Sequence, residues 1–395
     1  MATAPVTASL AQSSLAQTPL HAWHEAHGGR MVDFAGWSMP VHYGSIVAEH
    51  TATRTACGLF DVSHMGRLRF VGPGAAEFLD SVVTRRLTDM QLGQIRYGLV
   101  TNDIGGILDD VLVYRLPAPT VAHPANLVDS DHFVMVVNAS NREKIVQWLN
   151  DKLAGRDDVK LEDLTTIYAM IAVQGPLARQ LVEPLFDADL HSLKYYHGMY
   201  AATKTGWPAL VSRTGYTGED GYEIIVLENG AVEVWEAILA AGKDQGARAC
   251  GLGCRDTLRL EAAMPLYGHE LSESINPLQA GLDFAVNLEK RSFCGSWALL
   301  QARQSPLPQV RVGLELTGKR VPREHYSILA GKAVAGDAAI GEITSGTFSP
   351  TLDRPIAMGY VAQEFSAVGT ELQIDIRGGL TAARVVRLPF YSRKK

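Results

Sequence analysis

The sequence lacks a surplus of basic residues. Its 395 residues include 36 Lys and Arg against 42 Asp and Glu, which gives a formal net charge of −6. A nucleic-acid-binding face needs a concentrated excess of Lys and Arg. The charge balance therefore argues against a nucleic acid as partner.

Long apolar runs are also absent. No stretch approaches the about 18 residues that a membrane-spanning helix needs. The first 20 residues contain neither Lys nor Arg, whereas a secretory signal begins with positive charge and a mitochondrial transit peptide is rich in Arg. We therefore expect no membrane partner, a disordered leader over residues 1–17, and a cytoplasmic location.

Cysteine is scarce as well. The four cysteines, Cys57, Cys250, Cys254 and Cys294, fit a reducing compartment. Cys250 and Cys254 are too few ligands for a zinc site without a second pair. We expect buried structural thiols and no metal.

Apolar residues, in contrast, are abundant. They make up 47% of the chain, while charged residues make up 20%, a composition that permits packed cores and excludes general disorder. At about 150 residues per domain, the length predicts two or three domains.

Helical spacing of apolar residues predicts three helices, over residues 75–83, from Ser140 to Gly155, and over residues 231–241. Ser140 and Glu143 have the spacing of a capping box. The apolar stripe expected for the third helix comprises Val232, Trp235, Ile238 and Leu239.

Strand-like runs lie between these helices. Because helices and strands are mixed without a regular βαβ alternation, we expect an α+β fold rather than a doubly wound sheet. The predicted strands cover residues 67–71, 97–101, 107–116, 133–137, 167–174, 209–213 and 222–227.

The pattern of the sequence changes after about residue 290. Ser305, Pro306 and Pro308 indicate a linker, which we place over residues 291–308. Residues 309–395 contain short runs that Gly and Pro separate, with no convincing helix, which predicts a small β-barrel or sandwich. These runs cover residues 310–316, 340–344, 357–361 and 371–376.

Two adjacent carboxylates, Asp109 and Asp110, follow a predicted hairpin turn at residues 102–106. Strand alternation sends them to opposite faces, so only one can point into a pocket. The alternative is a polar strand end with both acids in solvent. Adjacent strand residues cannot converge on one atom, which weakens their interpretation as a catalytic pair.

A third acid, Glu223, shares a strand face with Ile225 and Leu227. A carboxylate on an apolar face is costly unless it is paired or bound to a ligand, although solvent at the strand end is the alternative. The preceding segment, residues 215–221, has glycine at every third position. It lacks the Lys-Ser/Thr ending and the following helix of a phosphate loop, so we interpret it as a hairpin turn.

Two arginines share one face of a predicted helix, because Arg255 and Arg259 are four residues apart. The alternative is a surface helix whose charge is neutralised by acids such as Glu261. His64 has the chemistry of a base, but a histidine at a strand edge is more often structural, and no Ser or Cys nucleophile pattern accompanies it.

Taken together and in chain order, several of these segments resemble the glycine cleavage T-protein family of aminomethyltransferases. The resemblance runs from about residue 18 to residue 390 and is specific in combination, although each segment alone is weak. The segments that carry it are residues 24–37, 59–65, 105–110, 215–223, 249–261 and 344–346.

The resemblance implies three subdomains around a central folate cleft. The first two would be interleaved mixed α/β subdomains over residues 18–290, and the third a C-terminal β-barrel over residues 309–395. It further implies transfer of a one-carbon unit from the aminomethyl-lipoyl arm of the H-protein to tetrahydrofolate. Ammonia would be released and methylenetetrahydrofolate formed, without a metal.

The resemblance also assigns site residues. It places the critical aspartate at Asp110 and a pterin-binding carboxylate at Glu223. An acceptor-only carboxylate suits the donor edge of a pterin, and aromatic walls suit its flat ring. The folate contacts that the resemblance implies are Met65, Tyr97, Asp110, Tyr196, Tyr216, Glu223, Arg255 and Arg393.

Two alternatives stay open at this point. One is a folate-dependent demethylase of the same superfamily, which would act on a methylated amine or sulfonium compound. The full oxidases of that group carry a flavin domain with a Gly-x-Gly-x-x-Gly turn, and the sequence has no such turn. The other alternative is a folate-binding regulator without catalytic activity.

Overall fold

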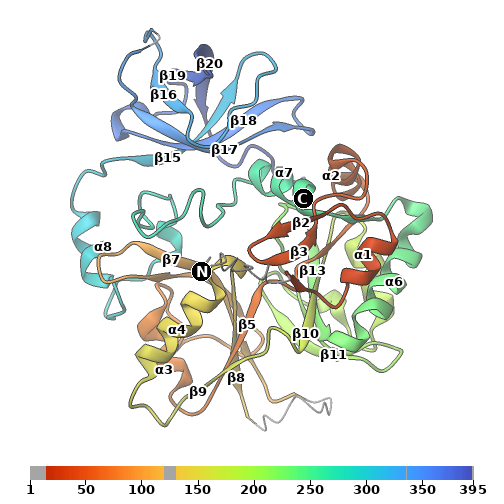
Figure 1. Cartoon of the computed structure of the whole chain (residues 1–395). Coiled ribbons are helices and arrows are strands. Elements are labelled where there is room, and N and C mark those ends of the chain that lie inside the picture. Colours follow the sequence, from red (N-terminus) through yellow and green to blue (C-terminus); the bar gives the residue numbers. More distant parts are fainter. Residues whose placement is uncertain (1–14, 120–129, 335, 394–395) are drawn as a thin grey trace, which may run out of the picture.

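The computed structural model describes residues 15–119, 130–334 and 336–393. Two sheet-and-helix subdomains lie beneath a C-terminal barrel, which is blue in Figure 1. The α+β prediction is confirmed, because the sheets are mixed or antiparallel and the helices pack on their outer faces.

The first subdomain is built on a five-stranded sheet with the order β6-β7-β8-β5-β9. Helices α3 (Ala75–Val82) and α4 (Arg142–Leu153) cover one face and bury an apolar core around Phe70 and Phe78. The strands are β5 (Gly66–Val71), β6 (Ile95–Thr101), β7 (Ile107–Leu116), β8 (His132–Val137) and β9 (Lys160–Asp163).

The second subdomain has a six-stranded sheet with the order β11-β12-β13-β10-β4-β14. Helices α5 (Ala178–Val182) and α6 (Ala231–Gly242) pack on it around the buried Trp235. Its strands are β4 (Gly58–Asp61), β10 (Tyr168–Gln174), β11 (Gly198–Ala202), β12 (Pro208–Ser212), β13 (Gly221–Leu227) and β14 (Arg248–Cys250). Because β4 precedes every strand of the first subdomain in the chain, the two subdomains are interleaved, as expected.

The N-terminal segment wraps the second subdomain. Strand β1 (Ala16–Gln17) pairs in parallel with β3 (Trp37–Pro40), which pairs with β2 (Met31–Phe34). Helices α1 (His21–Ala26) and α2 (Ile46–Thr55) complete it. Residues 1–14 of the predicted leader lie outside the described residues, but Ala16 and Gln17 are not disordered, because the edge of β3 supplies their backbone partners.

The C-terminal prediction of a β-barrel is confirmed. Six strands close in the order β15-β18-β17-β16-β19-β20, and β15 pairs with both β18 and β20. Helix α7 (Leu252–Glu261) packs against β17 and β18. The barrel strands are β15 (Val310–Leu316), β16 (Ser327–Ala330), β17 (Gly341–Ser349), β18 (Arg354–Val361), β19 (Glu371–Ile376) and β20 (Gly379–Val386).

Two local predictions are wrong, and one helix was not predicted. This helix, α8 (Ser296–Arg303), lies within the segment interpreted as a linker, and its Leu299 is fully buried against Val286 and Phe293. Helix α4 begins at Arg142 after a 3-10 turn, and the capping box at Ser140 does not form. In α6, Val232 is 38% exposed, while Val234 takes its place in the core.

Within the described ranges, no helix is long and apolar enough to cross a membrane. All four cysteines are free thiols. Cys57, Cys250 and Cys254 are buried as expected, whereas Cys294 is only half-buried, with its Sγ 3.1 Å from Asp103 Oδ1.

Candidate functional site

Asp110 lies on β7 opposite Leu99 of β6, and it is partly exposed. Tyr97, two residues before Leu99, donates its hydroxyl to Asp110 Oδ2 at 3.1 Å. The ring of Tyr97 stacks on Phe284 with 6.1 Å between centroids. Burial raises the pKa of Asp110, against the hydrogen bonds from Asn138 and Tyr97, which lower it.

Asp109 is fully buried, so the alternative of two solvated acids is wrong. Its carboxylate accepts hydrogen bonds from the Asn138 backbone N–H at 3.0 Å, from Asn138 Nδ2 at 2.8 Å and from Asn141 Nδ2 at 2.7 Å. Asn138 Nδ2 also donates to Asp110 Oδ1 at 2.7 Å. The two acids therefore converge on one amide, which the expectation of opposite faces excluded. Both carboxylates contact the segment that follows β8, where Asn138 lies.

Glu223 is 5% exposed on β13, so the strand-end solvent alternative is wrong. The hydroxyl of Thr214 donates to its Oε2. Its Oε1 has no hydrogen-bond partner among the residues that the structure describes. Burial raises the pKa of Glu223, against the hydrogen bond from Thr214 and the charge of Arg255, which lower it.

Arg255 projects from α7 over the ring of Tyr216, with 4.8 Å between its guanidinium carbon and the ring centroid. The hydroxyl of Tyr216 donates a hydrogen bond to the carbonyl of Pro265, which holds the ring in place. Arg255 Nη1 is buried and has no hydrogen-bond partner. A buried, unpaired guanidinium donor is costly, so this atom marks a place where a ligand acceptor would fit.

Burial raises the pKa of Tyr196, and the neighbouring Tyr195 and the charges of Glu223 and Asp110 add to this shift, so Tyr196 lies within range of both acids. Its backbone has a positive φ of 57°, an uncommon conformation for a tyrosine. Met65 and Tyr196 pack against the same apolar cluster. The structure thus brings seven of the predicted residues into one region: Met65, Tyr97, Asp110, Tyr196, Tyr216, Glu223 and Arg255.

Arg393 lies at the edge of this region. Its Nη1 is 3.4 Å from Asp220 Oδ1, without hydrogen-bond geometry. Its guanidinium carbon lies 5.9 Å from the ring centroid of Tyr195, which in turn contacts Tyr196 edge to face at 4.9 Å. The ring of Tyr195 therefore lies between Arg393 and Tyr196.

Helix α7 is not a surface helix, and the alternative that treated it as one is wrong. Arg259 is 1% exposed and forms an ion pair with Glu270 at 2.7 Å. Its Nη2 donates to Ser345 of the barrel at 2.8 Å, and Thr344 donates to Glu270 at 2.6 Å. Sequence reasoning missed Glu270; the segment 344–346, singled out only as part of the resemblance, was the available signal.

His64 is also buried, and its Nδ1 has no hydrogen-bond partner. Burial lowers the pKa of His64 to about 4; the charge of Asp61 opposes this shift, and the charges of Arg255 and Arg67 add to it. The ring is therefore neutral near pH 7. Because the charge of Arg255 acts on it, His64 lies close to the site.

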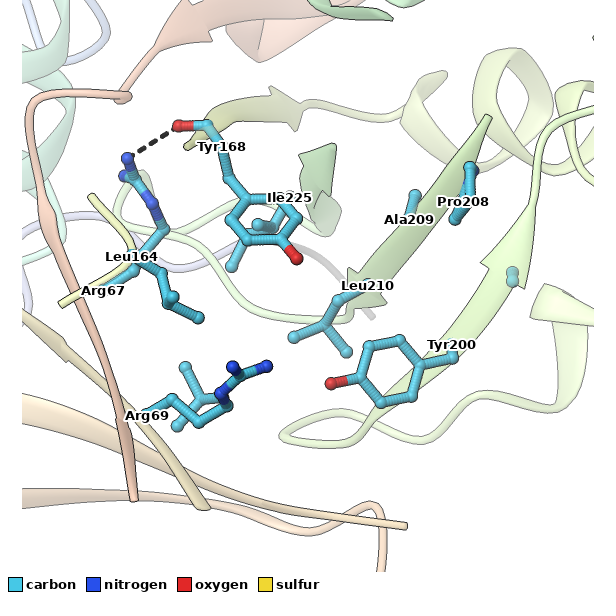
Figure 2. Close-up of a pocket in the computed structure, with 11 residues that line it drawn as sticks. Arg67, Arg69, Leu164, Tyr168, Tyr200, Pro208, Ala209, Leu210 and Ile225 are labelled. Atoms are coloured by element: carbon cyan, nitrogen blue, oxygen red, sulfur yellow. Dashed lines mark hydrogen bonds between the residues drawn. The ribbon is translucent and has the colours of Figure 1, made fainter. Parts of the chain in front are cut away.

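A separate pocket opens between β5, β12 and β13 (Figure 2), and it is lined by none of the eight predicted residues. The guanidinium of Arg67 donates to the carbonyls of Met65 and Tyr168, and Arg69 is paired with Glu162 at 2.7 Å. Tyr200 is bonded to His132 at 2.8 Å. The polar groups around this pocket therefore serve the fold.

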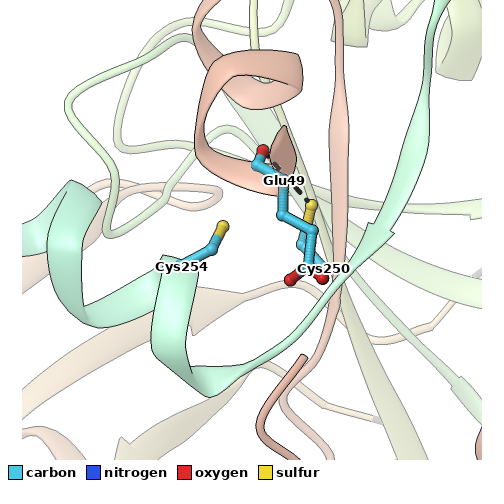
Figure 3. Close-up of side chains that lie close together, drawn as sticks. All are labelled: Glu49, Cys250 and Cys254. Atoms are coloured by element: carbon cyan, nitrogen blue, oxygen red, sulfur yellow. Dashed lines mark hydrogen bonds between the residues drawn. The ribbon is translucent and has the colours of Figure 1, made fainter. Parts of the chain in front are cut away.

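Glu49 approaches Cys250 and Cys254 (Figure 3), and the three ligand atoms lie within 4.8 Å of one another. The two cysteines therefore have a third potential metal ligand that sequence spacing did not reveal. Both carboxylate oxygens of Glu49 already accept backbone N–H groups, from Tyr43 at 2.7 Å and from Gly251 at 2.9 Å. Structural zinc sites use four ligands, and this cluster offers three.

Comparisons with known proteins agree with this arrangement. The family model described as the GCVT N-terminal domain matches residues 20–290, and that of the glycine cleavage T-protein C-terminal barrel domain matches residues 309–392. The aminomethyltransferase of Streptomyces coelicolor is 46% identical over 391 residues, covering 98% of this chain and 100% of the relative. That of Symbiobacterium thermophilum is 44% identical over 383 residues, covering 96% and 98%.

A solved structure is similar over the same length. The crystal structure of glycine cleavage system aminomethyltransferase T from Bartonella henselae superimposes with a TM-score of 0.85 at 33% identity. The match covers 96% of this chain and 98% of that one. These matches show that the chain belongs to the glycine cleavage T-protein family of aminomethyltransferases.

Proposed function

We propose that this chain transfers the one-carbon unit of an aminomethyl group, carried on the lipoyl arm of the H-protein, to tetrahydrofolate. Ammonia is released, the dihydrolipoyl thiol is freed, and methylenetetrahydrofolate is formed. The observation that carries the proposal is a pair of polar groups close enough for their charges to interact. These are Glu223, whose carboxylate accepts a hydrogen bond from Thr214, and Arg255, whose Nη1 is a buried donor without an acceptor and whose guanidinium lies over the ring of Tyr216.

These two groups fit a pterin. Glu223 would accept from the donor edge of the ring, and Arg255 would donate to an acceptor on it. Tyr97, Tyr196 and Tyr216 would supply flat apolar walls. Met65 would lie against the ligand, and Arg393 would contact its outer end. In this arrangement, the region enclosed by the eight residues is the folate cleft.

Asp110 would act on the reacting nitrogens. As an ionised carboxylate it can accept a proton or stabilise developing positive charge, and both effects gain strength where water is excluded. Much of the rate would come from holding the carrier arm and the folate nitrogen in contact. We propose no metal for this chemistry.

The partner in this proposal is the lipoyl-bearing H-protein, and the setting is the cytoplasm. Four free thiols suit a reducing compartment. The curated relatives are aminomethyltransferases along their whole length, and this observation favours the transfer reaction over a folate-dependent demethylase or a silent regulator.

The test is ammonia release from chemically aminomethylated H-protein, with and without tetrahydrofolate. We expect fast release only when tetrahydrofolate is present, with an equal amount of methylenetetrahydrofolate formed. Folate binding without turnover would overturn the proposal in favour of a regulator. Demethylation of a methylated amine without any response to H-protein would overturn it in favour of a demethylase.

A further inference from the structure

One side-chain amide joins the two adjacent acids of β7. Asn138 Nδ2 lies 2.8 Å from Asp109 Oδ1 and 2.7 Å from Asp110 Oδ1. A primary amide has two N–H groups, so one hydrogen serves each carboxylate. Both N–H groups of the Asn138 amide are thus used by the two acids. The amide nitrogen also lies 3.3 Å from the backbone carbonyl oxygen of Asp110.

The backbone explains why this residue reaches both acids. Strands β7 and β8 are antiparallel, with Leu112 opposite Val136. Continuing that register past the end of β8 sets Asn138 opposite Asp110. The backbone N–H of Asn138 then bonds Asp109 at 3.0 Å, which fixes the position of its Cα.

We propose that Asn138 is a positioning residue, which holds the Asp110 carboxylate in its working orientation while the buried Asp109 anchors the amide. The inference rests on the proposed role of Asp110. Asp109 itself is fully buried and cannot touch substrate. Burial and the charge of Asp110 raise the pKa of Asp109 to about 7, against its hydrogen bonds from Asn138 and Asn141, which lower it.

Burial and Asn138 act on Asp110 in opposite directions. Burial raises the pKa of Asp110, whereas the hydrogen bond from Asn138 stabilises the ionised carboxylate and lowers its pKa. The other titratable groups that face Asp110 are the hydroxyls of Tyr97, Tyr196 and Tyr216. These are neutral near pH 7, because burial raises their pKa values.

The hydrogen bond from Asn138 gives a test through the pH dependence of turnover. If ionised Asp110 is the active form, turnover falls on the acid side of its pKa. Asn138→Ala removes a donor, so the acid limb of the kcat profile should move up by about one pH unit. Asp109→Asn keeps an acceptor oxygen for the Asn138 amide, so the limb should move less than in Asn138→Ala. Asn150→Ala, at an exposed asparagine on the following helix α4, is the matched control and should leave the limb in place.

The kinetic constants separate positioning from binding. For Asn138→Ala we expect kcat to fall about 10-fold at the optimum while the KM for tetrahydrofolate stays within about 3-fold. Thermal melting is recorded for every variant. If Asn138→Ala fails to fold, Asn138→Ser, which keeps a shorter donor, should show a smaller upward shift of the limb.

The outcomes distinguish this inference from the proposed function. Asp110→Asn should abolish the acid limb together with most of the turnover. If it does, but the folded Asn138 and Asp109 variants keep the wild-type limb, the positioning inference is wrong and the proposed function stands. If Asp110→Asn keeps full turnover and the wild-type limb, the catalytic assignment itself fails. A larger shift of the limb in Asp109→Asn than in Asn138→Ala would also contradict the inference.

Discussion

At position 223 the chain buries a carboxylate on an apolar strand face with one hydroxyl donor and one unused oxygen. Such a group lowers the stability of the folded chain unless a ligand completes its hydrogen bonds. We therefore expect Glu223 to contribute to ligand binding rather than to the stability of the fold. The same reasoning applies to Arg255, whose Nη1 is buried without an acceptor.

We expect Glu223→Gln to weaken tetrahydrofolate binding by about 1.5–3 kcal/mol, the usual size of a hydrogen bond to a charged group. Glutamine keeps the shape but replaces one acceptor oxygen with a donor. Calorimetric titration measures the effect, with Glu228→Gln as the control because Glu228 is exposed just beyond the same strand. Unchanged affinity in Glu223→Gln would remove this residue from the binding site.

Residue by residue, the sequence could predict which acids lie on strands but not what surrounds them. The alternation around Glu223 correctly placed it among apolar neighbours. For Asp109 and Asp110 the same rule failed, because the partner of both acids, Asn138, is 28 and 29 residues away in the chain. Side-chain torsions let two carboxylates turn toward a shared donor, and strand periodicity carries no information about torsions.

At the scale of elements, helix α7 joins the N-terminal part of the chain to the barrel. Glu261, at its end, accepts from the hydroxyls of Ser349 and Thr351 and lies 2.9 Å from Arg54 Nη2 of α2. His50 Nε2 lies 3.3 Å from the same carboxylate. Although burial opposes it, the hydrogen bonds from His50 and Ser349 and the charge of Arg54 hold the pKa of Glu261 at about 2.

This depressed pKa makes stability depend on pH. Because the folded state binds a proton on Glu261 less tightly than the unfolded chain does, the contribution is complete above the ordinary pKa and is lost as the pH falls toward about 2. At about 1.4 kcal/mol per unit, we expect Glu261→Gln to lower the free energy of unfolding by about 3 kcal/mol at pH 7.

Denaturant unfolding of the full chain at several pH values measures this difference. It should shrink between about pH 4.5 and pH 2, where the wild-type carboxylate becomes protonated. Glu364→Gln, an exposed acid of the barrel, is the control and should be neutral. A Glu261→Gln variant as stable as the wild type at pH 7 would show that the network between α2, α7 and the barrel adds nothing to stability.

Element boundaries show where sequence periodicity stops being informative. The capping box at Ser140 was wrong because the polar residues on either side of it, Asn138 and Asn141, bind Asp109 instead of the helix N–H groups. Helix α8 was missed because its one buried apolar residue, Leu299, is defined by contacts with another segment. Helix α7 was correctly placed, but its burial depends on charges from α2 and on hydroxyls from the barrel.

At the scale of the molecule, the site residues come from all of the chain's parts. Asp110 and Tyr97 belong to the first sheet, Glu223 to the second, Arg255 to the helix beneath the barrel, and Arg393 to the C-terminal tail. The order of the parts was predictable, because the resemblance covers nearly the whole chain. The place where these parts meet in space was not predictable, since no local sequence pattern relates β7 to β13.

We also expect charge to steer the H-protein toward the mouth of the proposed cleft. The formal charge of −6 is a sum that hides local patches, and the expectation comes from the carrier partner itself. Stopped-flow association rates should fall as salt rises from low to physiological concentration, because salt screens charges beyond about 8–10 Å. A rate that stays flat would show that docking is mainly apolar.

The central claim is that Asp110 carries the chemistry of a folate site. Steady-state ammonia release from aminomethylated H-protein in the Asp110→Asn variant, with tetrahydrofolate affinity measured on the same sample, tests it most directly. Asparagine keeps the size and most of the hydrogen bonding while removing the charge. We expect turnover to fall by about 10²-fold or more with folate still bound, whereas near-normal turnover in a folded Asp110→Asn enzyme would contradict the account.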